Sequence, residues 1–458
     1  MGIDAAALKA FTKTFKGTTS SPGDADYDES RGIFNTMIDR KPAFIARATD
    51  ADDVAGVIAL ARDTGTPLTV RSGGHSVAGM SITDDAILLD TRAINTITVD
   101  PDKRVARVGG GAIWGELDAA TAQHGLVTTG GRVSTTGVAG LTLGGGSGWA
   151  ERKYGLACDR LVSVELVTAD GSQVRASADE NPDLFWALHG GGGNFGVATQ
   201  FEFRLDALSM MYVGLILYTP DKAEEVARNY RDFAATAPDE LGGGFAFLTG
   251  PPEEFVPEHL QGTIMCGVIA TWFGDPDEGE KALAPITEFG SPDVAVKMPI
   301  PYVEFNKMLD DPPGHRNYWT ASYHDAFPDS AIDGFIGYGR QMKPSAAQLV
   351  FLPWGGAVAR VDPGSTPMAR RDTAWVTHPF ALWMDAGDDD FWINWARGFN
   401  KDMKSFSSGG VYLNFIGNEG EDRIVAAYGK ANHDRLAKIK GQYDPDNVFR
   451  FNQNIKPA

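Results

Sequence analysis

The residue whose type and setting first suggest chemistry is His75, in the segment Arg71-Ser-Gly-Gly-His-Ser76 that follows a predicted strand at 67–70. An imidazole titrates near neutral pH and can serve as a base, a nucleophile or a metal ligand. The two glycines before it, Gly73 and Gly74, lack a Cβ, so a ligand can lie directly against their backbone. An isolated loop histidine is usually a surface residue, and the case for a site therefore depends on the sequence around it.

Glycine clusters occur four times in the first 200 residues, and the His75 loop contains one of them. The other three lie in the segments Gly109–Gly111, Gly144–Gly148 and Gly190–Gly196. Loops of this kind let backbone N–H groups approach a phosphate or a flat ring. One such loop is more often an ordinary turn, but four together favour a shared ligand.

Familiar nucleotide and metal motifs do not account for these loops. Gly191, Gly193 and Gly196 have the spacing G-x-G-x-x-G, but a helix-like segment at 183–189 precedes them and a strand-like segment at 197–205 follows. That spacing indicates dinucleotide binding only when it follows a strand and opens a helix, so we reject a Rossmann-type site. The sequence has no Walker loop, HExxH helix or GxSxG elbow, and we predict no metal site.

Composition narrows the function classes. The 458 residues contain 41 basic and 60 acidic side chains, for a formal net charge of −19. Such a field repels phosphate backbones and anionic lipids, so we expect a small-molecule substrate and neither a nucleic-acid nor a membrane partner. The two cysteines, Cys158 and Cys266, cannot build a disulfide framework. The N-terminus lacks an apolar leader and no apolar stretch approaches a membrane span, so we expect a cytoplasmic protein.

Periodicity predicts three segments along the chain. The first alternates short strands and helices, with helices at 51–62 and 113–123 and strands at 67–70, 86–89, 104–108 and 161–168. The pattern changes near 207–212, after which come a helix at 221–233, a strand at 262–273 and many Pro and Gly breaks. A short strand at 411–415 and a helix at 422–442 follow. We therefore expect boundaries at 1–207, 208–409 and 410–458.

Several motifs together resemble one enzyme family. They are Arg71–Ser76, Gly137–Gly140, Gly144–Gly146, Tyr154–Leu156, His189–Gly196 and the tail Tyr443–Phe449 with Asn452. In order and spacing they are similar to the flavin-linked oxidases of the vanillyl-alcohol oxidase / p-cresol methylhydroxylase group, and the tail resembles the berberine-bridge-enzyme branch. The resemblance covers about residues 40–207 and 410–455.

This resemblance implies an α+β architecture. Two subdomains of a PCMH-type FAD-binding domain, built from both ends of the chain, would hold FAD, and the middle region would form a substrate domain with an antiparallel sheet covered by helices. The residues that the resemblance assigns to FAD are Arg71, Ser72, Gly73, Gly74, His75, Ser76, Gly79, Thr136, Gly137, Gly140, Gly144, Gly145, Tyr154, Cys158, Gly196, Val197, Tyr412, Asn414 and Asn452.

The resemblance further implies that His75 bonds covalently to the flavin. Many relatives add a second bond from a cysteine shortly before the Gly137-Val138 motif, where this chain has Val133. We therefore expect a single covalent link, and we expect Cys158 to be a small buried thiol rather than an attachment point. Leu141 stands where plant relatives often have a histidine, and Thr136 occupies the position thought to control oxygen access.

The catalytic base is harder to place. Plant relatives use a tyrosine directly after an asparagine, but here Asn414 precedes Phe415, and the region around 359–360 offers no glutamate. Tyr412 is the best family-located candidate, with Tyr323 and His324 behind it and His378 as a further possibility. A tyrosine would need a lowered pKa or a proton transfer concerted with hydride loss.

The resulting prediction is an FAD-dependent oxidase that takes a hydride from a C–OH group of a sugar, alcohol or secondary metabolite and is reoxidised by O2. A dehydrogenase or an amine oxidase of the same fold is the alternative within the family, and amine oxidation is attractive because a neutral amine needs no base. A catalytically silent flavin- or carbohydrate-binding protein is the alternative from another class.

Overall fold

The N-terminal subdomain forms around the helix expected at 51–62. In the computed structural model, which describes residues 3–311 and 313–458, α3 (Ala51–Thr64) begins where Asp50 accepts a hydrogen bond from the Asp53 N–H at 2.9 Å. It ends at Gly65, whose φ of +65° suits glycine. The helix packs on a four-stranded sheet in the order β1-β2-β4-β3, in which β4 is parallel to both neighbours. The bounds are α1 (Ala5–Phe11), β1 (Thr18–Ser20), α2 (Tyr27–Ser30), β2 (Phe44–Arg47), β3 (Leu68–Arg71) and β4 (Ile87–Asp90).

A second subdomain is built on a five-stranded antiparallel sheet in the order β5-β6-β10-β8-β9. Its strands are β5 (Ile97–Asp100), β6 (Val105–Gly109), β8 (Leu161–Val167), β9 (Gln173–Ser177) and β10 (Val197–Arg204). Its other elements are α4 (Trp114–Ala122), β7 (Leu126–Val127), α5 (Val138–Leu143), α6 (Glu151–Tyr154), α7 (Pro182–Leu188) and β11 (Asp206–Ala207). Three of the glycine clusters lie at the ends of β6, α5 and α7 in this subdomain, and the His75 loop follows β3, so each is carried by the end of a strand or helix.

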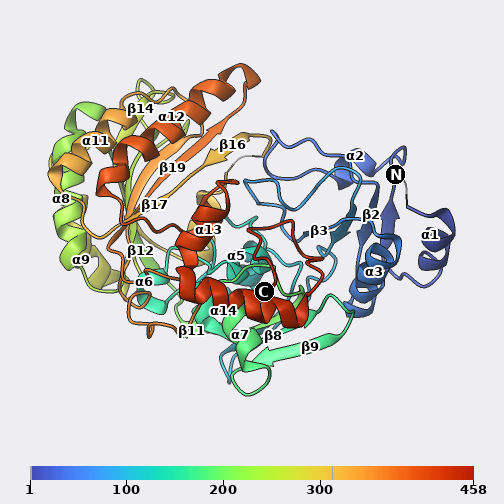
Figure 1. Cartoon of the computed structure of the whole chain (residues 1–458). Coiled ribbons are helices and arrows are strands. Elements are labelled where there is room, and N and C mark those ends of the chain that lie inside the picture. The colour runs from blue at the N-terminus through green and yellow to red at the C-terminus, as the bar shows by residue number, and fades with distance from the viewer. Residues whose placement is uncertain (1–2, 312) are drawn as a thin grey trace.

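The middle of the chain forms one large sheet with helices on one face (Figure 1). Its strand pairs are all antiparallel. In sheet order the strands are β15 (Val294–Ile300), β12 (Met211–Tyr218), β14 (Ile264–Trp272), β13 (Leu241–Thr249), β18 (Gln348–Pro353), β19 (Trp375–Trp383) and β16 (Arg316–Trp319), with β17 (Ser322–His324) also paired to β19. The covering helices are α8 (Ala223–Thr236), α9 (Pro276–Thr287), α11 (Asp329–Gly339) and α12 (Asp389–Asp402). The expected α+β class, with a helix-covered antiparallel sheet, is confirmed.

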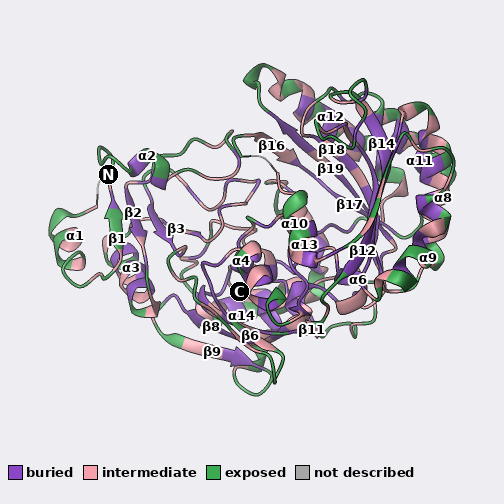
Figure 2. Cartoon of the chain, turned by 180° about the vertical axis from the view of Figure 1, so that it is seen from behind, coloured by how far each residue is buried: buried purple, intermediate pink, exposed green. Residues whose placement is uncertain are grey.

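Burial separates the two faces of this sheet. The strands are largely buried, whereas the helices expose their outer sides (Figure 2). On β18, Leu349 and Phe351 pack into the core beneath the helices, while Gln348, Val350 and Leu352 line a cavity on the other side. Successive side chains of a strand point to opposite faces of the sheet, so β18 packs one face against the helices and turns the other toward the cavity. The inner face of the sheet can therefore form a wall of the cavity.

The C-terminal segment returns to the N-terminal half of the molecule, where it lies beside α7 (Figure 1). The single helix expected at 422–442 is wrong: α13 (Glu421–Tyr428) and α14 (Lys430–Tyr443) are separate. They break at Gly429, whose φ of +70° and ψ of 152° cannot continue a helix. The tail is then tied down, because Asn194 Nδ2 donates to the Gln453 carbonyl and Asn194 Oδ1 accepts from the Ile455 N–H.

The strand expected at 411–415 is also wrong. Residues Leu413–Phe415 form a single 3-10 turn instead. Val411, Tyr412 and Leu413 are buried in the core without pairing in a sheet, whereas Asn414 and Phe415 face a cavity. None of the helices in the described part of the chain is both long and apolar enough to cross a membrane.

The buried pair Lys440–Asp444 anchors this C-terminal segment, and both side chains are fully buried. The Lys440 ammonium also donates to the carbonyls of Asn194 and Phe449, each at 2.8 Å. Replacing Lys440 with methionine would leave the carboxylate of Asp444 buried and unpaired. We expect this change to lower the free energy of unfolding by about 3–5 kcal/mol in urea titrations.

The matched control for this prediction is Lys430→Met on the same helix. Lys430 pairs with Asp434 at the same spacing of four residues, but both side chains are exposed. Exposed pairs contribute little, so the control should change stability by about 0.5 kcal/mol or less. Equal effects of the two substitutions would contradict the anchoring role of Lys440.

Candidate active site

The glycine loops and the inner face of the large sheet enclose a cavity of about 820 Å³. The clusters at 72–76 and 190–196 each contribute several lining residues, the cluster at 144–148 contributes Gly144 and Ser147, and Gly110 comes from the fourth. The opposite wall is formed by β13, β18 and β19, and the tail adds Phe451, Asn452 and Gln453. The expectation that these loops serve one ligand thus has a physical basis, since they line one space.

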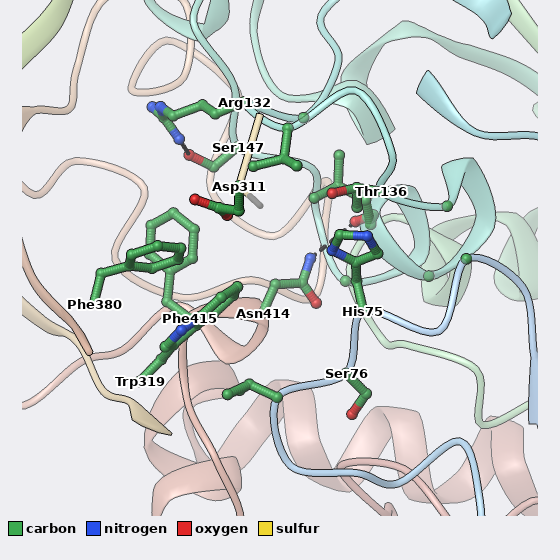
Figure 3. A pocket seen from close by; sticks show the side chains of 18 of the residues that line it. His75, Ser76, Arg132, Thr136, Ser147, Asp311, Trp319, Phe380, Asn414 and Phe415 are labelled. Carbon is green, nitrogen blue, oxygen red and sulfur yellow. Dashed lines mark hydrogen bonds between the residues drawn. The ribbon is translucent and has the colours of Figure 1, made fainter. Parts of the chain in front are cut away.

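His75 projects from the end of β3 into this cavity (Figure 3). Its ring stacks on Phe34, with centroids 4.2 Å apart and planes inclined by 17°. Nε2 lies 3.0 Å from Thr135 Oγ1, and no other hydrogen bond to the imidazole involves the described residues. Burial lowers the pKa of His75 to about 4. The imidazole is therefore neutral at pH 7, held in place through Nε2, and has Nδ1 available.

The loop around His75 has the geometry of an anion cradle. The backbone N–H groups of Gly73, Gly74, His75 and Ser76 find no acceptor in the described part of the chain. Gly74 has a φ of +74°, and successive N–H groups in turns with left-handed residues form concave anion sites. A Cβ on Gly73 would overlap the backbone of Gly137, so the two loops meet only because both are glycine there. These features fit the pyrophosphate of a dinucleotide.

Open space over other glycines supports the same fit. A Cβ added to Gly140 or Gly193 would meet no atom within 4 Å, and both residues line the cavity. A side chain there would fill space that a bulky cofactor needs. By contrast, the described residues contain no group of three or more His, Cys, Asp or Glu side chains placed to hold a metal ion. The geometry thus favours an organic, phosphate-bearing cofactor.

His378 faces the cavity from β19 on the opposite wall. Its Nδ1 lies 2.9 Å from the Thr320 carbonyl, which can only accept, so Nδ1 carries the proton and Nε2 keeps its lone pair. The ring lies flat on Phe415, with centroids 4.3 Å apart. The side chain is 6% exposed, and burial lowers the pKa of His378 to about 4. A neutral imidazole with one free nitrogen therefore borders the cavity.

Carboxylates outnumber cations on the cavity wall. Asp310, Asp311 and Glu253 line it, and Arg132 is the one Lys or Arg among the lining residues described. Arg132 is already occupied: it donates to Glu151 at 2.7 Å and to Ser147 Oγ at 2.8 Å (Figure 3). Asp311 Oδ2 is buried and has no hydrogen-bond partner among the described residues. Burial, with a smaller contribution from Asp310, raises the pKa of Asp311 to about 7.

Comparisons with known proteins agree with the fit to a flavin. Residues 42–177 match the FAD binding domain model, and residues 411–456 match the model described as berberine and berberine like. An uncharacterized FAD-linked oxidoreductase of Bacillus subtilis, YgaK, is 30% identical over 447 residues, with 95% of each chain covered. The (R)-6-hydroxynicotine oxidase of Paenarthrobacter nicotinovorans is 30% identical over 473 residues, with 97% of each chain covered.

The chain belongs to the berberine-bridge-enzyme-like FAD-linked oxidoreductases. It is accordingly an FAD-linked oxidoreductase, as the resemblance implies. The crystal structure of 6-hydroxy-D-nicotine oxidase from Arthrobacter nicotinovorans superposes with a TM-score of 0.85 at 28% identity, covering 97% of this chain and 99% of that one. Fold and cofactor class therefore apply to the whole length of the chain.

Within this berberine-like fold, most residues assigned to FAD line the cavity. They are Ser72, Gly73, Gly74, His75, Ser76, Thr136, Gly137, Gly140, Gly144, Gly196, Val197, Asn414 and Asn452. Six assigned residues do not line it, and these are Arg71, Gly79, Gly145, Tyr154, Cys158 and Tyr412. Arg71, for example, is buried and donates to Asp90 at 2.7 Å and to the Gly32 carbonyl at 2.8 Å. These bonds fix the end of β3, from which the His75 loop starts.

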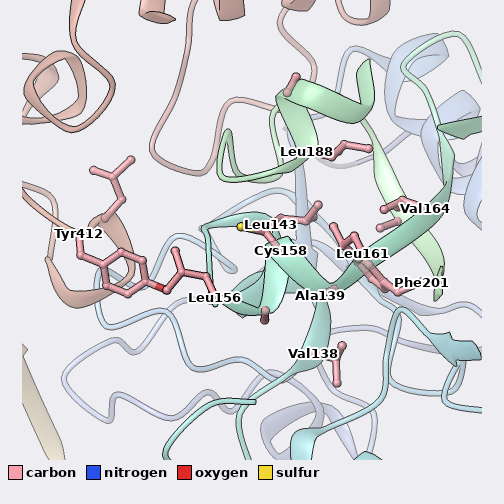
Figure 4. Close-up of a cluster of buried hydrophobic side chains, with 14 of the residues drawn as sticks. Val138, Ala139, Leu143, Leu156, Cys158, Leu161, Val164, Leu188, Phe201 and Tyr412 are labelled. Atoms are coloured by element: carbon pink, nitrogen blue, oxygen red, sulfur yellow. The ribbon is translucent and has the colours of Figure 1, made fainter. Parts of the chain in front are cut away.

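Cys158 lies in the hydrophobic core between α5 and β8 (Figure 4). The residue is fully buried, and burial raises the pKa of its thiol well above the usual value. A thiol in this state is a poor nucleophile. The position agrees with the expectation of a small buried side chain.

The three named catalytic candidates are not among the cavity-lining residues. The Tyr412 hydroxyl accepts from the N–H groups of Gly146 and Ser147, each at 2.8 Å, and from Asn414 Nδ2 at 2.9 Å. Burial raises the pKa of Tyr412 despite these bonds. Both ring nitrogens of His324 are hydrogen-bonded, to the Phe406 carbonyl and Thr377 Oγ1, and Tyr323 is buried against Trp354.

Sequence reasoning missed the polar residues of the substrate end. Arg132, Asp310, Asp311 and Gln348 all line the cavity. The only local signal is the adjacent pair of aspartates, which ordinarily indicates a solvated loop. Asp310 reaches the site because it accepts from the Ser134 N–H at 2.6 Å and from Ser134 Oγ at 2.5 Å, across 176 positions of sequence. Such a contact depends on the tertiary fold and leaves no signal in the local sequence.

Proposed function

We propose that this chain is an FAD-dependent oxidase that carries its flavin on one covalent bond from His75 and oxidises a C–OH group of a small ring-bearing substrate. The observation that carries the proposal is the neutral imidazole of His75 at the cavity wall, next to a backbone cradle suited to phosphate. An oxidised FAD would accept a hydride from the substrate at N5 and would pass the electrons on to O2.

The surroundings of His75 support a single attachment. Its Nε2 is engaged by Thr135 Oγ1, so Nδ1 is the nitrogen that would hold the cofactor covalently. Val133, which lines the cavity, has no nucleophilic atom. Cys158 is buried away from the cavity in its protonated form. We therefore assign the bond to His75 alone.

We assign the proton-accepting role to His378 rather than to Tyr412. Nε2 of His378 has a free lone pair and borders the cavity, whereas the Tyr412 hydroxyl is enclosed by three donors behind the Gly144–Gly148 loop. A base that takes the hydroxyl proton lets the C–H bond release a hydride more readily. The presence of this base favours alcohol oxidation over a base-free amine reaction.

The walls near His378 suit a flat or ring-shaped substrate. Trp319, Phe380 and Phe415 line the cavity close together (Figure 3). Trp319 and Phe380 lie with ring centroids 4.3 Å apart. Aromatic walls with a few polar groups are typical of small-molecule sites. The name of the hydroxynicotine oxidase relative is compatible with a ring-bearing substrate, and it keeps amine oxidation as the second candidate.

The test is anaerobic mixing of the purified protein with a panel of ring-bearing alcohols, sugars and cyclic amines. We expect at least one alcohol to bleach the flavin, and we expect air to restore the colour rapidly with one peroxide formed per flavin. Bleaching followed by slow recolouring would indicate a dehydrogenase. Reduction by amines alone would replace the alcohol assignment, and a flavin that no compound reduces would point to a silent binding protein.

A further inference from the structure

Among the described residues that line the cavity, Asp311 is the one carboxylate with a buried oxygen that has no hydrogen-bond partner. It follows α10 (Tyr302–Met308) and points toward the aromatic wall near Phe380 (Figure 3). Its Oδ2 makes no hydrogen bond with any described residue. Its neighbour Asp310 is fully engaged by Ser134, which fixes the backbone of this segment. The carboxyl group of Asp311 is therefore held in position but has no internal donor.

No lysine or arginine among the described lining residues is free to pair with this group. Arg132 is the one such cation there, and its guanidinium already donates to Ser147 Oγ, the Gly148 carbonyl and Glu151 and packs over the Trp149 ring at 5.3 Å. Burying a polar group without a partner is unfavourable. A ligand that donates a hydrogen bond to Asp311 would remove that cost.

The charge balance of the cavity indicates which donor fits. Asp310 and Asp311 line it, and the positive charge of Arg132 is matched by Glu151. His75 and His378 are neutral at pH 7. A cationic N–H group gains from this field, a neutral hydroxyl gains less, and an anion is repelled.

We infer that Asp311 is a specificity-determining residue that binds a protonated nitrogen of the substrate, so that the preferred substrate is a hydroxylated organic amine rather than a neutral sugar. This inference rests on the proposed function for the role of the cavity, and it adds the substrate class. The ring of such a substrate would lie against Trp319, Phe380 and Phe415. Its ammonium group would reach Asp311, and its hydroxyl group would face His378.

The test is isothermal titration calorimetry under nitrogen with two probes of similar shape, benzylamine and benzyl alcohol. At about pH 8 benzylamine is a cation and Asp311, whose pKa is about 7, is mostly ionised. We expect the wild-type protein to bind benzylamine more tightly than benzyl alcohol. Asp311→Asn should weaken benzylamine binding about tenfold or more and should leave the affinity for benzyl alcohol nearly unchanged.

The matched control is Glu253→Gln, which removes one negative charge from an exposed residue at the cavity mouth. Because exposed charges are screened, we expect both affinities to stay within about twofold. A benzyltrimethylammonium titration adds a second readout: its permanent charge cannot titrate, so its affinity should rise as the pH rises through about 7 and lose that dependence in Asp311→Asn.

The inference is overturned if wild-type protein binds benzylamine no better than benzyl alcohol, or if Asp311→Asn weakens both probes equally. Calorimetry needs neither turnover nor colour, which separates the two proposals. Charge-selective binding without any flavin reduction would refute the proposed oxidase function and support the role of Asp311. Oxidation of neutral alcohols with no charge selectivity in binding would support the proposed oxidase function and refute the role of Asp311.

Discussion

Replacing His378 with asparagine is expected to slow substrate-driven reduction of the flavin by about 10²-fold, the lower end of the range that general base catalysis contributes, because a pKa of about 4 makes this imidazole a weak base. Asparagine can keep the hydrogen bond to the Thr320 carbonyl through its amide N–H but offers no basic nitrogen. The flavin should remain bound, because His378 lies on the wall opposite the His75 loop. Anaerobic stopped-flow absorbance measures the reduction rate directly.

The pH profile distinguishes a base from a structural residue. The lowered pKa of His378, about 4, means that Nε2 is free above that value. The reduction rate of the wild-type protein should therefore fall as the pH drops toward about 4. For cationic substrates the reduction rate should change a second time near pH 7, where Asp311 ionises. A rate in His378→Asn within threefold of wild type would contradict the assignment.

Replacing His75 with alanine is expected to leave no flavin attached to the protein after denaturation. The His75 side chain supplies the only nucleophilic nitrogen on the loop at the end of β3. Phe34 and Thr135, which contact the imidazole, have no nitrogen in their side chains that could replace it. The variant can still bind FAD through the backbone cradle at 73–76. In-gel fluorescence after denaturing electrophoresis reports the attached fraction.

Thr135→Val is the companion variant. It removes the hydrogen bond to His75 Nε2 but keeps the imidazole, so attachment should still occur, at a lower rate. If His75→Ala protein kept its fluorescence in the gel, another residue would be the attachment point. If Thr135→Val lost it entirely, the hydroxyl would be essential for the bond and not merely for positioning the ring.

The parts of the fold and site that could be predicted from the sequence are those set by local chemistry. Asp50 and Gly65 mark the two ends of α3, and the glycines around His75 indicate a backbone that a ligand can approach. The resemblance then gives the fold class and FAD, which the comparisons confirm. Each of these features is encoded within a few neighbouring residues.

The sequence could not show which side chains face the cavity and which face the core. Tyr412 and Asn414 are two residues apart, yet one is buried behind the Gly144–Gly148 loop and the other lines the cavity, because the segment forms a 3-10 turn instead of a strand. The sequence around His378 and His324 likewise does not show which of the two reaches the cavity. Only the pairing of β17 and β18 with β19 determines that His378 borders the cavity while both nitrogens of His324 are used inside the core.

The most direct test of the central proposal is peptide mapping of the acid-precipitated wild-type protein. The account predicts a yellow pellet and, after digestion, a single flavin adduct on the peptide that contains His75, with the thiol of Cys158 unmodified. Release of all the colour into the supernatant, or an adduct on any other residue, would contradict the account.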